Sequence, residues 1–149
     1  MVGIELMNFD LKNADLRGSN LTGANLRRSD LTGANLTDTN MTEADLMGIN
    51  LTNTKLVNTN LSGAKLSYAN INAADINGVI LKNAHLNNSI VVNSKIIDSD
   101  MTGTNLYNAD FTGTEIILDT LRGAVLCETV MPSGHTENRG CSTVIWQTR

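Results

Sequence analysis

The side chains that could support acid–base or nucleophilic chemistry are few and scattered in this sequence of 149 residues. The only histidines are His85 and His135, and neither has a serine or cysteine and an acid at a spacing that suggests a catalytic triad. The aspartates and glycines recur at regular intervals, which indicates an architectural role rather than a paired-carboxylate site or a phosphate-binding loop. The sequence suggests no reaction, no metal site and no cofactor, so we expect a protein that is not an enzyme.

The two cysteines, Cys127 and Cys141, bracket a Pro-Ser-Gly turn signal. A disulfide that closes this loop would contribute about 3 kcal/mol in the chain-entropy description. In a cytoplasm the same pair would usually stay reduced. A zinc site that includes His135 would be incomplete, because two cysteines and one histidine supply only three ligands. A disulfide and a pair of free thiols therefore both remain open.

Charge and hydropathy exclude several classes of protein. The net charge of −4 argues against direct nucleic-acid binding, which requires a basic stripe. There is no apolar run long enough for a membrane-spanning helix. The first residues lack the basic and apolar regions of a signal peptide, so we expect a cytoplasmic location, with the periplasm or thylakoid lumen as the alternative if a leader has been removed.

The dominant feature is an apolar residue at every fifth position, in all 25 positions from Leu6 to Leu126. A second register, two residues earlier, holds Ala, Ser or Thr at 20 of the 23 positions from Ala14 to Ala124. The exceptions are Ile49, Val79 and Asp119. Asp or Asn usually precedes the central apolar residue, and Gly or Asn is common two positions after it. The chain is therefore a repeat protein with a five-residue unit.

A five-residue period fits neither an α-helix, on which the apolar residues would spiral round every side, nor a flat strand with its two-residue alternation. It fits a unit that makes one short extended side and then a turn, with Gly and Asn giving the turn its backbone freedom. Four units close a square coil, and the chain supplies about six coils, whose stacking buries the central residues. The sequence thus predicts an all-β, four-sided β-helix.

Several units resemble the A(D/N)LXX motif of the pentapeptide repeat family, among them Ala14–Gly18, Ala24–Arg28, Ala34–Asp38 and Ala44–Gly48. The resemblance covers about residues 4–128. It implies a right-handed quadrilateral β-helix, and the hand of the coil rests on the resemblance alone.

A solenoid needs capped ends. At the start, Ile4 and Phe9 replace small residues and are expected to plug the open coil. The tail resembles that of cyanobacterial and chloroplast members of the family, in which a cysteine, a Met-Pro-x-Gly turn and a second cysteine recur. We therefore divide the chain into a β-helix over residues 1–128 and a capping tail over residues 129–149, in which Val144, Ile145 and Trp146 are expected to cover apolar surface.

The outward positions favour a structural or protein-binding solenoid with protein partners, as a monomer or homodimer. Most of them are polar, and the apolar exceptions can mark an interface. The candidate interaction patch comprises Val57, Ile90, Val92, Ile97 and Ile117. The alternative for this patch is that the C-terminal tail covers it.

A second hypothesis is DNA mimicry, because some members of the family modulate DNA gyrase by presenting an acidic rod. That mechanism needs uncompensated negative charge along one side. Here one column of residues spaced by four units alternates in sign. It reads Asp15, Asn35, Lys55, Asp75, Lys95 and Glu115. The sequence therefore favours the protein-binding solenoid over the DNA mimic.

Overall fold

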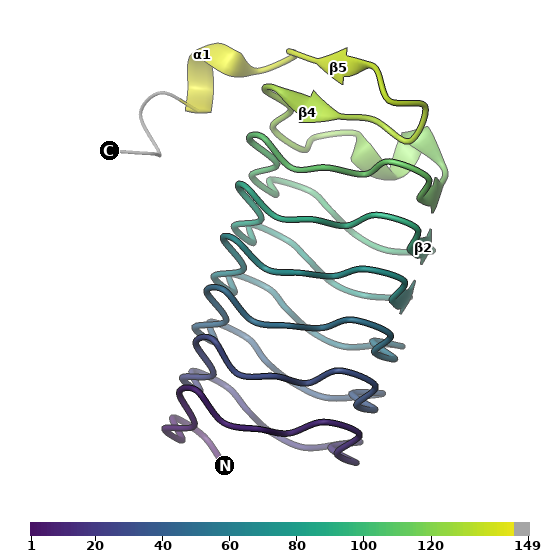
Figure 1. Ribbon diagram of the computed structural model, residues 1–149. Helices are drawn as coiled ribbons and strands as arrows, with labels where there is room; N and C mark the ends of the chain where they lie inside the picture. The colour runs from purple at the N-terminus through teal and green to yellow at the C-terminus, as the bar shows by residue number, and fades with distance from the viewer. Residues whose placement is uncertain (145–149) are drawn as a thin grey trace.

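The computed structural model describes residues 1–144 of the chain, which winds into a stack of four-sided coils. Figure 1 shows the coils piled along one axis, with the N-terminus at one end of the stack and the C-terminal segment lying across the other. Parallel bridges join residues that are 20 positions apart, for example Asp15 with Asn35 and Asn35 with Lys55. Four five-residue units therefore make one coil, as the spacing of the apolar residues predicts.

Regular secondary structure is short because each side of a coil is only a few residues long. One side carries a three-stranded parallel sheet in the order β1-β2-β3, and the C-terminal end carries an antiparallel pair, β4-β5. The elements are β1 Asp75–Asn77, β2 Lys95–Ile97, β3 Glu115–Ile116, the 3-10 helix η1 Leu118–Leu121, β4 Thr129–Val130, β5 Thr136–Glu137 and the helix α1 Cys141–Val144. Elsewhere the sides pair through single bridges.

A regular corner of the coil is a tight turn that needs one residue in the left-handed backbone conformation. Ala24 N–H donates to the Leu21 carbonyl at 3.0 Å, and Gly23 between them has φ +62°. This is the pattern of a turn whose third residue has positive φ, and Gly and Asn adopt that conformation at least cost. The repeated Gly or Asn of the sequence therefore marks the corners of the coil.

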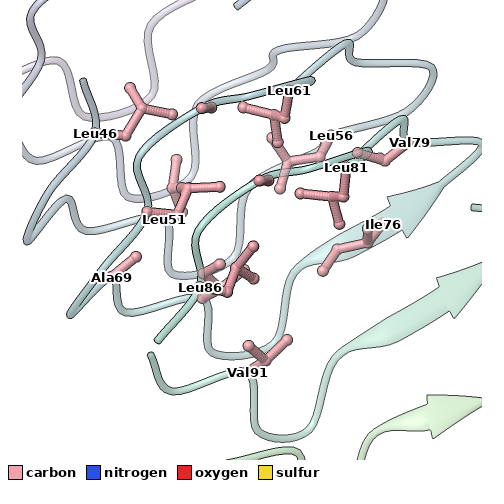
Figure 2. Packing of buried hydrophobic residues seen from close by; sticks show 14 of the residues in the cluster. Leu46, Leu51, Leu56, Leu61, Ala69, Ile76, Val79, Leu81, Leu86 and Val91 are labelled. Atoms are coloured by element: carbon pink, nitrogen blue, oxygen red, sulfur yellow. The ribbon is translucent and has the colours of Figure 1, made fainter. Parts of the chain in front are cut away.

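The interior is filled by the two inward registers. Figure 2 shows central residues of successive units, such as Leu51, Leu56 and Leu61, directed into the coil. All three are at most 2% exposed. The small residues complete the core. Where they are Ser or Thr, most hydroxyls donate to a carbonyl of the preceding coil, as Thr59 Oγ1 does to Leu36 O at 2.7 Å. Others donate within their own coil, as Thr54 Oγ1 does to Leu51 O at 2.7 Å. The hydroxyls of the small register are thereby satisfied inside an apolar core.

The two ends of the stack differ. In the first coil Ile4 packs against the core, whereas Phe9 remains 52% exposed. At the other end β4, β5 and α1 lie over the last coil (Figure 1), and the buried Leu126 and Met131 belong to the core beneath them. The stacked pairing continues to Val130, which bridges to Asp110. The division of the chain at residue 128 stays a prediction.

Candidate functional site

The outward carboxylates and amides accept hydrogen bonds within the turns of the coil. The N–H and hydroxyl of Thr22 both donate to Asn20 Oδ1, at 3.1 and 2.6 Å. The same hydrogen bond, in which a side-chain oxygen accepts from the backbone N–H two residues later, recurs around the coils, for example at Asp30 and Asp110. These Asx turns explain why Asp or Asn precedes the central residue. They support the interpretation that the regularly spaced carboxylates are architectural.

Within the part of the chain that the structure describes, six of the fifteen acidic side chains also form ion pairs with nearby cations. Side-chain hydrogen bonds from Arg17 lower the pKa of Asp15 to about 2. The ion pairs are Lys12 with Asp10 and Asp30, Arg17 with Asp15, Arg27 with Asp45, Lys95 with Glu115, and Arg122 with Asp119. Because these pairs are distributed along the stack, they break up any continuous negative column.

The predicted interaction patch falls on two adjoining sides of the coil. Ile97 ends β2 on the side that carries the three-stranded sheet, and Val57 and Ile117 belong to the same outward column. Ile90 and Val92 flank the buried Val91 on the neighbouring side. Whether the five residues form one interaction patch stays a prediction.

The most exposed part of this region lies where the repeat is interrupted. Ile117 is 63% exposed and Leu118 is 66% exposed. Here the small inward register holds Asp119, whose carboxylate turns outward to pair with Arg122 at 2.8 Å, and η1 replaces the regular corner. The described part of the tail leaves Ile117 and Leu118 uncovered. We call Ile97, Ile117 and Leu118 the apolar edge.

The tail is tied to the last coil through its cysteines. Cys127 and Cys141 form a disulfide with a Cα–Cα distance of 4.6 Å. In the intervening turn, Ser133 Oγ and His135 Nδ1 are 2.7 Å apart, a pairing that the sequence did not suggest. Both side chains are exposed, and no carboxylate in the described part of the chain orients His135 as a catalytic base would require. Ile145 and Trp146 lie outside the described residues, as does the side chain of Val144.

A groove of about 460 Å³ opens on a different side, the one whose central residues include Leu66 and Leu86. Its floor is Ser67, which is 8% exposed, and Asn87, and Ser67 Oγ donates to Asn87 Oδ1 at 2.8 Å. Met47 lies one coil before this floor and Tyr107 one coil after it. The lining residues are Met47, Lys65, Ser67, Tyr68, His85, Asn87, Asn88 and Tyr107. We call this feature the tyrosine groove, because it contains both tyrosines of the chain.

The groove arises from differences in side-chain size within one outward column. The column reads Met47, Ser67, Asn87 and Tyr107, so two short side chains lie between two long ones. The five-residue pattern predicted neither this groove nor a site role for His85, which the structure places in its wall. A comparison of outward residues spaced by four units along the sequence would have shown that two short side chains lie between two long ones.

Neither a metal centre nor a membrane helix is visible in the part of the chain that the structure describes. Among residues 1–144, no group of three or more His, Cys, Asp or Glu side chains could hold a metal ion. None of the helices within the same residues is long and apolar enough to cross a membrane.

Comparison with known proteins identifies the family. The model for pentapeptide repeats matches eight copies, over residues 10–48, 44–83 and 81–113. The chain therefore belongs to the pentapeptide repeat family, and its coil is the right-handed quadrilateral β-helix of that fold. No match was found among curated proteins.

Solved structures give the same fold. The chain is 25% identical, with a TM-score of 0.64, to a pentapeptide repeat protein from the Arabidopsis thaliana thylakoid lumen, covering 91% of this chain and 90% of that one. It is 23% identical, with a TM-score of 0.50, to Rfr23 from the cyanobacterium Cyanothece 51142, covering 83% and 88% of the two chains. A trypsin-treated form of QnrB1, a plasmid-mediated fluoroquinolone resistance protein, is 13% identical with a TM-score of 0.48, covering 99% and 95%, and this likeness carries no functional argument.

Proposed function

We propose that this pentapeptide repeat protein is a non-enzymatic solenoid that binds another protein through the apolar edge. The observation that carries the proposal is the exposure of Ile117 and Leu118, at 63% and 66%, on a stacked and hydrogen-bonded scaffold. A cluster of exposed apolar residues on a rigid surface is typical of an interface, because burying it against a partner removes that area from water. Ile97 extends the edge along the sheet, and the Lys95–Glu115 ion pair borders it.

Affinity capture with matched variants tests this proposal. The immobilised chain is compared with an Ile117→Ser/Leu118→Ser variant and with a Met7→Ser/Ile80→Ser control, which removes exposed apolar side chains outside the predicted patch. We expect a partner that the wild-type chain and the control retain and the edge variant loses. Equal retention by all three proteins, equal loss from both variants, or no captured protein would contradict the proposal. Sedimentation of the purified chain shows whether the partner is a second copy.

The DNA-mimic alternative is less well supported by the charge distribution. The ion pairs of Asp15 with Arg17, Asp45 with Arg27 and Glu115 with Lys95 interrupt the negative columns that such a mimic would present. We therefore expect no effect of the purified chain on DNA supercoiling by gyrase at micromolar concentration.

We further propose that the protein works in an oxidising compartment, such as the thylakoid lumen or the periplasm, rather than in the cytoplasm. The Cys127–Cys141 disulfide supports this location, because disulfides persist where thiols are not kept reduced. The similar Arabidopsis thaliana protein from the thylakoid lumen supports it as well.

A further inference from the structure

The tyrosine groove is large enough to hold a small ligand or a short stretch of peptide. Its volume of about 460 Å³ lies within the range of ligand pockets. It extends from Met47 to Tyr107, three coils apart, which is roughly 14 Å at the usual spacing of paired strands. That length matches about four residues of extended peptide, each of which rises about 3.4 Å.

The polar groups in the groove are mainly hydrogen-bond donors. Lys65 contributes an ammonium group, His85 a ring N–H and Tyr68 a phenolic hydroxyl, all from exposed side chains. At the floor Asn87 uses its Oδ1 to accept from Ser67, which leaves the amide NH₂ of Asn87 to face a ligand. A ligand for this groove must therefore supply acceptors.

The carboxylates near the groove already have partners. Asp45, which bridges to Lys65 from the coil before, pairs with Arg27 at 3.4 Å. Glu128, beyond the far end, accepts a hydrogen bond from Tyr107 and thereby raises the pKa of that phenol. No carboxylate lines the groove, and Lys65 has no ion pair among the residues that the structure describes. The groove thus presents an uncompensated cation in a chain whose net charge is −4.

We infer that the tyrosine groove binds a short extended peptide segment that carries acidic side chains. A carboxylate of this segment lies between Lys65 and the Asn87 amide, where charge-assisted hydrogen bonds are strongest. Met47, Tyr68 and Tyr107 contact the flanking residues, because tyrosine supplies a large contact surface at a low entropic cost. The groove lies on a different side from the apolar edge, so this inference does not rest on the proposed function.

Nuclear magnetic resonance titration of the full chain tests the inference. The probe is the blocked pentapeptide acetyl-AEAEA-amide, and the controls are acetyl-AQAQA-amide and free glutarate. We expect saturable shifts of the amide signals of residues 65–68, 85–88 and 107 with the acidic peptide, and at least tenfold weaker binding of both controls. Because the groove does not include the apolar edge, we expect the acidic peptide to shift the same signals by the same amount in the Ile117→Ser/Leu118→Ser variant.

Charge-reversal variants complete the test. Lys65→Glu is expected to weaken binding of the acidic peptide by more than tenfold, and Lys65→Gln by about fivefold. Lys55→Glu makes the same change of net charge at an exposed lysine on another side and is expected to alter binding by less than twofold. The inference is overturned by the absence of saturable shifts at millimolar peptide, by equal binding of the glutamine peptide, or by equal loss in the Lys65→Glu and Lys55→Glu variants. Equal binding of glutarate would also overturn it, in favour of a free organic acid.

Discussion

At the scale of single residues, the repeat assigns a fixed task to each position of the unit. The central residue fills the core, Asp or Asn accepts from the turn, and Gly or Asn takes the left-handed conformation, as at Asn20 and Gly23. A residue that departs from the type expected at its position should therefore change the stability of the coil or serve another purpose. Asn72 and the acid-sensitive aspartates give two measurable cases.

Asn72 replaces a threonine-like residue in its outward column. Among the residues that the structure describes, its Oδ1 is buried without a hydrogen-bond partner. One coil before, Thr52 donates both its N–H and its hydroxyl to Asn50 Oδ1, at 3.1 and 2.7 Å. We expect Asn72→Thr to copy this arrangement and to raise the free energy of unfolding by about 1 kcal/mol. Urea denaturation measures the change, the reverse substitution Thr52→Asn serves as a matched control, and a lower midpoint for Asn72→Thr would contradict the account.

The Asx turns predict a loss of stability in acid. Hydrogen bonds from the hydroxyl and N–H of Thr32, with Lys12 nearby, lower the pKa of Asp30, and those of Thr102, with Lys82 nearby, lower the pKa of Asp100. Because the folded-state pKa of each lies below the ordinary value of 3.8, the stabilisation is fully present above that pH and is lost as pH falls through the folded value.

Substitution of both aspartates isolates this effect. Asn keeps the accepting oxygen and does not titrate, so Asp30→Asn/Asp100→Asn is expected to flatten the decline of the denaturation midpoint below about pH 4. Asp98→Asn, at an exposed aspartate that occupies a corner instead, is the matched control. A decline with the same slope in the wild type and the double variant would show that these turns do not set the acid stability.

At the scale of elements, the C-terminal cap differs from the coils in the interactions that stabilise it. The coils are held by continuous backbone pairing, which still includes Val130 of β4 through its bridge to Asp110. In contrast, β5 and α1 depend on the antiparallel pair of β4 with β5 and on the Cys127–Cys141 disulfide. The cap is therefore the element whose stability can be changed separately from that of the stack.

Removal of the disulfide tests this separation. We expect Cys127→Ser/Cys141→Ser to lower the free energy of unfolding of the cap by about 3 kcal/mol, because the loop loses its covalent closure. Hydrogen exchange should rise in residues 129–144 and in the last coil, while the amides around Leu56 keep their protection. The wild-type chain treated with reductant should behave in the same way. A uniform rise in exchange along the whole chain would show that cap and stack unfold as one unit.

The sequence predicted the coil well and its surface poorly, for a physical reason. The five-residue register identifies the inward residues of the regular coils, such as Leu56 and Leu61, because their direction follows from local spacing. The tyrosine groove depends instead on the relative sizes of side chains that are 20 residues apart, such as Ser67 and Tyr107. Whether Ile117 is covered depends on the path of a tail that does not follow the repeat. The sequence therefore indicated Ile97 and Ile117 as outward apolar residues, but the exposure of Ile117 and the lining of the groove required the structure.

At the scale of the whole molecule, the stack behaves as a one-dimensional array in which each coil contacts only its neighbours. Leu56 is 1% exposed in the middle of the stack, whereas Leu16 is only half-buried in the first coil. Unfolding of a middle coil interrupts the array, whereas unfolding of an end coil only shortens it. The same substitution should therefore lower the free energy of unfolding more in the middle of the stack than at its end.

Leu56→Ala and Leu16→Ala test this difference. We expect Leu56→Ala to lower the free energy of unfolding by about 2–5 kcal/mol, the usual cost of a cavity at a buried leucine. Leu16→Ala should cost less than half as much and raise hydrogen exchange only in the first coils. Denaturation and hydrogen exchange of the two variants measure both effects. Equal costs would contradict the description of the protein as an array of coupled coils.

The central claim is that this solenoid acts by holding another protein at its apolar edge, and site-specific photo-crosslinking tests it most directly. A photoreactive benzoylphenylalanine replaces Leu118 in the edge or, as a control, the exposed Thr102 on another side. The account predicts a discrete crosslinked protein from position 118, absent from position 102 and lost on addition of excess unlabelled chain. No crosslink from position 118, or the same products from both positions, would contradict it.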